Sequence, residues 1–434
     1  MGDGAFFRVG EALTGPTSIG ARDAGESMRI EPALQRALRE GRPPAVVAAE
    51  LSLVRPLGWA DIPVVSVTTD PKGSVLRSRY VDGHCLVPGY LPQHDAITVS
   101  TLLRLGERLT DRLGERVPFF YGQDSQLEML YRHRSQLEQH YLFTLNTDPL
   151  AWAMHDKGLF FPLCVSAGIR VPCTVVASPG EDIAQALHQL RPPLVVKPRT
   201  KSDWKTIQRA LLESQGKARV FASAAELLAH PRFQELAELV VVQEMIEGPV
   251  TALYSFHGFA TPEGRLLASF CGRKLRTYPS VAGESAFIEL VHDGDLEATG
   301  RAIVQKLGIR GPFKIDLIRD ARSGELYTLE VNARFNLWHL LGAANGVNLP
   351  LLAYEYLCFG RVPTEPTRYD VRARWLDFYR DLKRQQEDTG LSGPRWLASL
   401  LFGHTVHDTF DWSDPMPFIA WMEKMVRARA ARMA

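Results

Sequence analysis

The segment that decides the fold reads Phe313-Lys314-Ile315-Asp316-Leu317-Ile318-Arg319, then a turn at Ser323-Gly324, then Leu326-Tyr327-Thr328-Leu329-Glu330-Val331-Asn332-Ala333-Arg334. Two apolar runs joined by a glycine-containing turn predict a β-hairpin. Side chains alternate between the faces of a strand, so Glu330 and Asn332 project from one face, where Asp316 can meet them across the hairpin. Arg334 lies two residues further along the same face.

The predicted hairpin face has the chemistry of a metal site. Two carboxylates and an amide oxygen are hard ligands of the kind that hold Mg²⁺ together with substrate phosphates. The sequence therefore offers Asp316, Glu330 and Asn332 as metal ligands, with Arg334 placed to hold an anion beside them. The alternative is a solvated hairpin face on which polar residues simply alternate.

Cations occupy several strand and helix ends upstream of the hairpin. Lys197 ends a buried apolar strand, as either an edge residue that reaches solvent or an anion ligand. Lys157 follows Asp156 at the start of a helix, where the helix dipole disfavours a cation, so it either holds a phosphate or pairs with Asp156. Lys274 and Arg276 end another strand, before a glycine-containing loop able to close over a substrate.

One strand end has features of a ring-binding segment. Gln243-Glu244-Met245-Ile246 leads from a β-branched strand into a Gly-Pro turn. Its backbone N–H and C=O groups can meet the edge of an adenine while Met245 and Ile246 cover the ring. An ordinary strand end is the alternative interpretation.

Length and charge exclude several classes of function. The chain has 434 residues, enough for two to four domains. Its 50 Lys and Arg against 49 Asp and Glu give no long-range attraction for nucleic acid. No apolar run reaches the roughly 18 residues of a membrane helix. From the charge and the apolar runs we expect no nucleic-acid or membrane partner. The cysteines are odd in number and scattered, which favours reduced, buried thiols in a cytoplasmic protein. They are Cys85, Cys164, Cys173, Cys271 and Cys358.

Strand and helix signals divide the chain into four parts. Residues 1–41 are rich in Gly, Ala and Arg and predict a weakly ordered arm. Residues 42–150 alternate strands and helices, which predicts a doubly wound α/β domain with a parallel sheet. Residues 151–363 contain consecutive strands and predict an α+β unit with an antiparallel sheet. Residues 364–434 predict a helical C-terminal segment.

The order of these motifs resembles the ATP-grasp superfamily, in particular its carboxylate–amine ligases such as D-aspartate ligase. The similarity covers roughly residues 43–434 and is carried by Leu53-Val54-Arg55-Pro56-Leu57-Gly58, Arg77-Ser78-Arg79-Tyr80, Asp156-Lys157, Val171-Pro172-Cys173-Thr174, Val196-Lys197-Pro198, Gln243-Glu244-Met245-Ile246, Gly272-Arg273-Lys274 and Leu329-Glu330-Val331-Asn332-Ala333-Arg334. It implies a pre-ATP-grasp domain at 42–150 and an ATP-grasp domain at 151–363. Two α+β subdomains would clasp ATP, with a lid at about 172–245.

The resemblance also implies roles for single residues. Lys157, Lys197 and Lys274 would contact the ATP phosphates. Asp316, Glu330 and Asn332 would hold two Mg²⁺ ions, for which Mn²⁺ can substitute. The adenine hinge would be Gln243, Glu244, Met245 and Ile246. The catalytic residues would be Arg334, Lys274 and Arg276, of which Arg334 would face the reacting carboxylate.

Two departures from the family pattern affect nucleotide binding. Val250 lies where members often carry an acidic residue for the ribose, and the usually glycine-rich loop after Lys197 has no glycine over Arg199–Lys205. The first bears on ribose contacts, and the second indicates that side chains close over the phosphates.

The resemblance implies an ADP-forming ligase that activates a small carboxylate as an acyl phosphate and joins it to an amine. Amino acids are candidate substrates, and a homodimer is the default assembly. Two alternatives are a carboxylase-type enzyme that phosphorylates bicarbonate and an ATP-binding module without catalysis.

Overall fold

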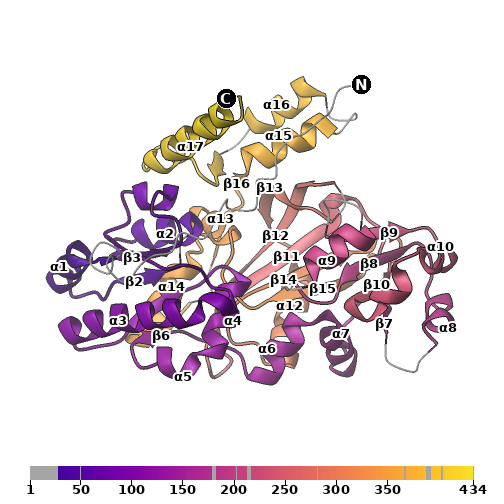
Figure 1. Ribbon diagram of the computed structural model, residues 1–434, viewed down its shortest axis with the longest axis horizontal. Coiled ribbons are helices and arrows are strands. Elements are labelled where there is room, and N and C mark those ends of the chain that lie inside the picture. Colours follow the sequence, from indigo (N-terminus) through magenta and orange to yellow (C-terminus); the bar gives the residue numbers. More distant parts are fainter. Residues whose placement is uncertain are drawn as a thin grey trace.

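The structure is a computed structural model that describes residues 28–48, 50–177, 182–201, 203–212, 217–280, 282–365, 368–387, 392–401 and 404–433. Three β-sheets form its frame (Figure 1). The N-terminal sheet lies at one end, a large sheet lies in the middle, and a small sheet lies at the other end. The C-terminal helices cover one long side of this arrangement.

The N-terminal sheet has six strands in the order β1-β4-β3-β2-β5-β6. Its elements are β1 (Met28–Arg29), α1 (Glu31–Glu40), β2 (Ala45–Val47), α2 (Leu51–Gly58), β3 (Val64–Thr68), β4 (Gly83–Leu86), α3 (Asp95–Leu113), β5 (Val117–Phe120), α4 (Asp124–Arg132), α5 (Arg134–Leu137) and β6 (Tyr141–Leu142). Strands β4, β3, β2, β5 and β6 run parallel, as predicted, and β1 pairs antiparallel with β4.

Part of the predicted N-terminal arm is folded, which corrects that expectation. Residues 28–41 form β1 and α1, and α1 buries Ala33, Leu34 and Ala37 against the sheet. The i, i+1, i+4 spacing of these apolar residues gives the helix one buried face, and Gly41 ends it in a left-handed conformation. Residues 1–27 lie outside the described residues.

The small sheet has four antiparallel strands in the order β7-β10-β8-β9. This part of the chain contains α6 (Asp148–His155), α7 (Lys157–Ser166), β7 (Thr174–Val176), α8 (Ile183–His188), β8 (Leu194–Pro198), α9 (Trp204–Ile207), β9 (Arg219–Phe221), α10 (Ala224–Leu228), α11 (Phe233–Leu236) and β10 (Val240–Glu244). Apolar residues of its strands and helices form a separate core.

The large sheet has seven strands in the order β15-β14-β11-β12-β13-β16-β17. Its elements are β11 (Leu253–Ala260), β12 (Leu266–Tyr278), β13 (Glu284–Val291), α12 (Gly294–Leu307), β14 (Gly311–Arg319), β15 (Leu326–Asn332), α13 (Trp338–Ala344), α14 (Leu349–Phe359), β16 (Ala373–Leu376) and β17 (His404–His407). The predicted hairpin is β14–β15, and the predicted antiparallel pairing holds as far as β16.

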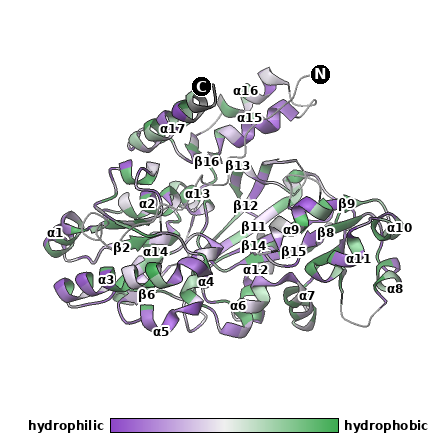
Figure 2. Cartoon of the chain, in the orientation of Figure 1, coloured by the Kyte–Doolittle hydropathy of each residue, from purple (hydrophilic) through white to green (hydrophobic). Residues whose placement is uncertain are grey.

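The C-terminal segment is not purely helical, which corrects a second expectation. It contains α15 (Phe378–Glu387), α16 (Gly393–Leu401) and α17 (Met416–Met433), but β16 and β17 also belong to it and extend the large sheet. Strand β16 pairs because Ala373, Trp375 and Leu376 are buried there. Helix α15 is largely hydrophilic in Figure 2.

The N-terminal sheet and the large sheet share one apolar core. Leu53, Val54 and Leu57 of α2 pack in the same cluster as Trp338 and Trp375. Because this cluster joins the two parts, it fixes how the carboxyl ends of the N-terminal strands face the large sheet.

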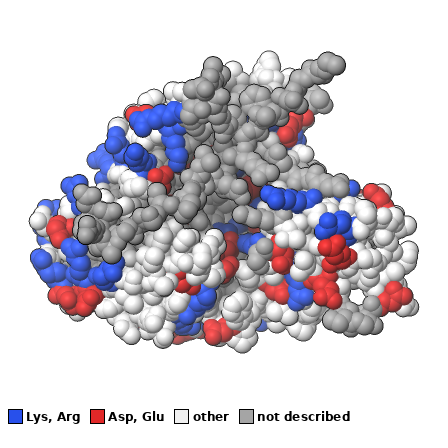
Figure 3. Space-filling view, viewed as in Figure 1, with Lys and Arg blue, Asp and Glu red and all other residues white. Residues whose placement is uncertain are grey.

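Among the described helices, none is both long and apolar enough to cross a bilayer. Basic and acidic side chains neighbour each other at both ends of the face in Figure 3. The five cysteines are free thiols, but the expectation that all are buried is wrong, because Cys173 is exposed and Cys358 half-buried.

Candidate active site

The β14–β15 hairpin brings the predicted oxygen ligands together. Asp316 and Glu330 lie directly opposite each other in the antiparallel register. Asn332 donates its side-chain N–H to Glu330 Oε1 at 3.0 Å, so the two share one strand face. Ser255, on the next strand β11, donates its hydroxyl to Asp316 Oδ1 at 2.5 Å.

This donor set fits Mg²⁺ bound mainly through a nucleotide. No group of three His, Cys, Asp or Glu side chains able to hold a metal occurs within the described part of the chain. Two carboxylates and an amide are the protein share of a site that phosphates and water complete. Burial raises the pKa of Glu330, but Lys157 and Lys201 outweigh it, so this pKa lies well below its ordinary value and the ligand is ionised.

Three predicted phosphate ligands gather opposite these oxygens. Burial of the Lys197 ammonium group and the positive charge of Lys157 lower the pKa of Lys197 to about 8. The negative charge of Glu330 acts in the opposite direction but is outweighed. Burial also lowers the pKa of Lys274, although Asp316 opposes it. The charge of Glu330 acts on both Lys197 and Lys274, and Lys157 in turn lowers the pKa of Glu330, so each of the three lysines is electrostatically coupled to this carboxylate.

None of these three lysines forms an ion pair with a described carboxylate. The lysines that do so in the described chain are Lys201, Lys217, Lys314 and Lys424. All three are half-buried, and cations partly withdrawn from water normally have a partner. Lys157, Lys197 and Lys274 could therefore hold an anion.

The loop after β8 is held by side chains instead of glycine. Arg199 Nε donates to both oxygens of Asp156, at 2.7 and 2.9 Å, and the Lys157 N–H donates to the Arg199 carbonyl at 3.0 Å. Asp156 thus pairs with Arg199, and the alternative in which it pairs with Lys157 is wrong. Thr200 donates to Asp203 at 2.6 Å within the same loop.

The predicted hinge segment ends strand β10. Gln243 is buried, and its side-chain Nε2 donates to Thr174 Oγ1 at 2.8 Å. Its side-chain oxygen Oε1 has no hydrogen-bond partner. The Glu244 carboxylate binds Arg191 at 2.8 Å, so its side chain is engaged within the protein. The N–H groups of Glu244 and Met245 donate to the carbonyls of Cys173 and Pro193. A role of this segment in adenine binding stays a prediction. Because the Glu244 side chain and both N–H groups are already engaged, that role would fall mainly to carbonyl groups and to Ile246.

Arg334 faces the N-terminal sheet. Its Nε donates to Asp124 Oδ1 at 3.0 Å and one terminal nitrogen donates to the Gly122 carbonyl at 2.9 Å. Burial lowers the pKa of Arg334, but Asp124 outweighs it and the net direction is upward. The guanidinium is therefore charged, fixed in place and close to the metal-ligand face.

The structure does not place Arg276 with the other predicted catalytic cations. Its guanidinium makes two hydrogen bonds to the buried Asp381 of α15, at 2.6 and 2.7 Å. Trp396 Nε1 donates to the same carboxylate at 2.7 Å. This geometry ties Arg276 to the C-terminal helices, and its catalytic role remains a prediction without geometric support.

No protein-family model matches the sequence, and no curated protein matches it. Solved structures do match. One is the biotin carboxylase domain of the Hydrogenobacter thermophilus 2-oxoglutarate carboxylase, in complex with MgADP, ADP and bicarbonate. It is 13% identical to this chain with a TM-score of 0.56, and the match covers 76% of this chain and 73% of that one. The Staphylococcus aureus N5-carboxyaminoimidazole synthetase complexed with ADP has 13% identity, TM-score 0.53, and 76% and 80% coverage. The Anaerococcus prevotii phosphoribosylglycinamide synthetase has 14% identity, TM-score 0.51, and 75% and 79% coverage.

The chain has the ATP-grasp fold. The likeness extends over about three quarters of the chain. In this ATP-grasp fold the small sheet contributes Lys197, and the large sheet contributes Lys274 and the oxygen ligands.

Sequence reasoning missed three charged residues that lie close to the predicted site. Asp124, at the start of α4, pairs with both Lys201 and Arg334. Glu50 follows β2, and a side chain added at Gly122 would collide with its carboxylate. A signal existed, because Glu50 and Asp124 both follow parallel strands, and open α/β sheets bind ligands at the carboxyl ends of their strands. Lys201 carried none, since its partner is far away in the sequence.

Proposed function

We propose that this chain is an ATP- and Mg²⁺-dependent ligase that joins a small carboxylate to an amine and releases ADP and phosphate. The observation that carries the proposal is the set of unpaired cations, Lys157, Lys197 and Lys274, facing the oxygen ligands of the hairpin. A triphosphate would supply the missing negative charge, and its metal would use Asp316 and Glu330. The ADP in two of the structures that share the fold supports this choice of ligand.

The first step activates the carboxylate. One of its oxygens attacks the γ-phosphorus of ATP, the bond to the β,γ-bridging oxygen breaks, and ADP leaves. The lysines draw charge from the phosphates, while Arg334 orients the reacting carboxylate. Mg²⁺ held by Asp316, Glu330 and Asn332 would neutralise charge on the phosphate oxygens.

The second step forms the amide. The amine nitrogen attacks the acyl carbon, the C–O bond to phosphate breaks, and inorganic phosphate leaves with its electron pair. Arg334 stabilises the oxyanion that develops on the acyl oxygen. The amine must also lose a proton. Burial raises the pKa of Glu50 to about 7 despite the nearby Arg334, which suits a group that accepts a proton at neutral pH.

ADP release from Mg-ATP tests this proposal. A panel of amino acids, other small carboxylates and bicarbonate is offered singly and with amines, with Glu330→Gln as the blank. ADP release that needs one carboxylate and rises with one amine, with the amide identified by mass spectrometry, supports the ligase. Release with bicarbonate alone would indicate a carboxylase-type enzyme. Absence of ATP binding would overturn every nucleotide-dependent function.

A further inference from the structure

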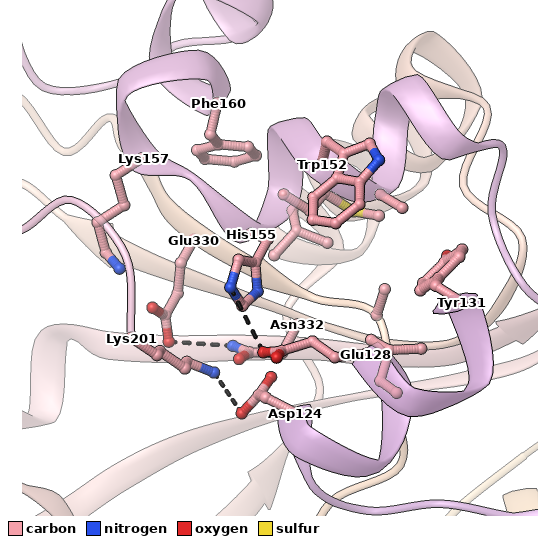
Figure 4. A pocket seen from close by; sticks show the side chains of 15 residues that line it. Asp124, Glu128, Tyr131, Trp152, His155, Lys157, Phe160, Lys201, Glu330 and Asn332 are labelled. Carbon is pink, nitrogen blue, oxygen red and sulfur yellow. Dashed lines mark hydrogen bonds and ion pairs between the residues drawn. The ribbon is translucent and has the colours of Figure 1, made fainter. Parts of the chain in front are cut away.

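A pocket adjoins the predicted metal ligands Glu330 and Asn332 (Figure 4). Helix α4 forms one wall, α6 and the start of α7 form another, and the end of β15 forms the floor. Because Glu330 and Asn332 line it, a molecule in this pocket would reach the place where phosphoryl transfer is proposed. The side chains that line it are those of Asp124, Leu127, Glu128, Tyr131, Ala151, Trp152, Met154, His155, Lys157, Phe160, Lys201, Glu330, Val331, Asn332 and Ala333.

The part of the pocket farthest from the metal ligands is apolar and aromatic. Trp152 is 57% exposed although it is a large apolar residue on a helix, and it borders the pocket opposite Tyr131 in Figure 4. Leu127 and Met154 complete this surface. An exposed indole beside a second ring stabilises a ligand that has a flat or bulky apolar group.

The middle of the pocket is acidic. Glu128 lies 3.4 Å from His155 Nε2 and 3.9 Å from Arg132. Both contacts are too long for strong hydrogen bonds, so the carboxylate can still accept from a donor on a ligand. Glu128 lies between the aromatic part and the metal ligands in Figure 4.

The end of the pocket beside Glu330 holds charges of both signs, because Lys157 and Lys201 line it together with Asp124 and Glu330. Lys201 pairs with Asp124, whereas Lys157 has no carboxylate partner among the described residues. The pocket therefore presents one unpaired cation, then an acid, then aromatic rings. This order matches the carboxylate, the ammonium and the side chain of an apolar α-amino acid.

We propose that this pocket binds the acyl donor of the ligase, and that the donor is an α-amino acid with an aromatic or large aliphatic side chain. Its carboxylate lies beside Lys157 and the metal ligands, its ammonium beside Glu128, and its side chain against Trp152 and Tyr131. This inference rests on the proposed ligase function, since it names the substrate that the ligase activates.

The test uses the full chain and two pocket variants. Trp152→Ala should raise the KM for L-phenylalanine or L-leucine about tenfold in the ADP-release assay, with the KM for ATP unchanged, because only side-chain contacts are lost. Trp412→Ala removes an 88% exposed tryptophan far along the chain and should change neither value. Glu128→Gln should raise the KM for L-phenylalanine about tenfold and leave that for 3-phenylpropanoate, which has no ammonium, within twofold.

The outcomes separate this inference from the ligase function itself. ADP release stimulated only by small polar acids such as glycine or aspartate would overturn the pocket assignment and retain the ligase. An unchanged KM in Trp152→Ala would overturn it as well. If no acid stimulates release, the ligase function fails, and calorimetric titration of L-phenylalanine in the presence of Mg-ADP decides the pocket. Binding that Trp152→Ala abolishes would retain the site, and absence of binding would remove it.

Discussion

Two charged clusters of this chain differ in whether their charges are paired within the protein. Under the C-terminal segment, Arg55 is fully buried and its guanidinium donates to Asp414 Oδ2 at 3.1 Å and to the Thr409 carbonyl at 2.7 Å. Ser78 donates to the same Asp414 oxygen at 2.8 Å, and the Arg79 N–H donates to its other oxygen at 2.9 Å. Both charges of this pair are thus compensated within the protein.

Between the small and large sheets the charges are left open. Lys157, Lys197 and Lys274 have no carboxylate partner among the described residues, although the charge of Glu330 acts on Lys197 and Lys274. A closed ion pair contributes to the fold, whereas a cation held without a partner costs stability unless a ligand compensates it. The difference distinguishes a structural cluster from a binding site without reference to any related protein.

The largest effect should come from the open cluster. Glu330→Gln removes one ionised metal ligand at nearly constant volume, so we expect ADP release to fall at least about a thousandfold. Circular dichroism should show an unchanged fold. Glu325→Gln is the matched control, because this exposed residue lies just before the same hairpin strand, pairs with Arg170 and does not line the pocket beside Glu330. An active Glu330→Gln enzyme would contradict the metal assignment.

The closed cluster should respond in stability instead of activity. Asp414→Ala leaves Arg55 buried without a partner, so we expect a loss of about 3–5 kcal/mol in the free energy of unfolding, measured by urea denaturation. Breaking the exposed pair Lys424–Asp70 by Lys424→Ala should cost less than about 1 kcal/mol. Equal losses in the two variants would show that the buried pair contributes no more to the free energy of unfolding than the exposed pair.

The two clusters also differ in how far the sequence predicts them. The alternation of Glu330 and Asn332 on one strand is local, so period-two spacing was sufficient to place both on a single face. Arg55 and Asp414 lie in helices and loops at opposite ends of the chain, and no local pattern relates them. The same limit explains Arg276, which was predicted to end a strand and to act in catalysis, whereas it lies within β12 and Asp381 already compensates its charge. Local periodicity thus predicted the sheets and the ligand face, and tertiary pairing decided which cations remain open.

Glu50 lies between the two cases, because this half-buried residue has a charge that Arg334, Gln123 and Ser52 compensate only in part. Burial raises its pKa to about 7 from an ordinary 4.5. Between these two pH values Glu50 is therefore protonated in the folded state and ionised in the unfolded state. Its contribution to stability is complete below about pH 4.5 and is lost as the pH rises through 7. The loss amounts to at most about 3 kcal/mol.

Glu50→Gln should remove this pH dependence. Thermal unfolding at pH 5 and pH 8 should therefore show the variant gaining stability relative to the unmodified chain at pH 8 only. Ser52 contacts Glu50 at 3.4 Å, so Ser52→Ala, which keeps the carboxyl group, is a control that should retain the pH dependence. A Glu50→Gln variant with the same pH profile as the unmodified chain would contradict the raised pKa.

The smallest effect concerns the titration of one open cation. With a pKa of about 8, Lys197 is charged at pH 7 and increasingly neutral above pH 8, while bound phosphates would raise its pKa. The dissociation constant for Mg-ATP, measured by calorimetry, should therefore be flat near pH 7 and rise by up to about tenfold per pH unit above pH 8. Lys197→Ala should bind about tenfold more weakly at pH 7 and lose this slope. Lys197→Arg, whose charge does not titrate in this range, should lose the slope as well. A slope that survives in both variants would assign the titration to another lysine of the cluster, with Lys274 the first to replace because burial lowers its pKa too.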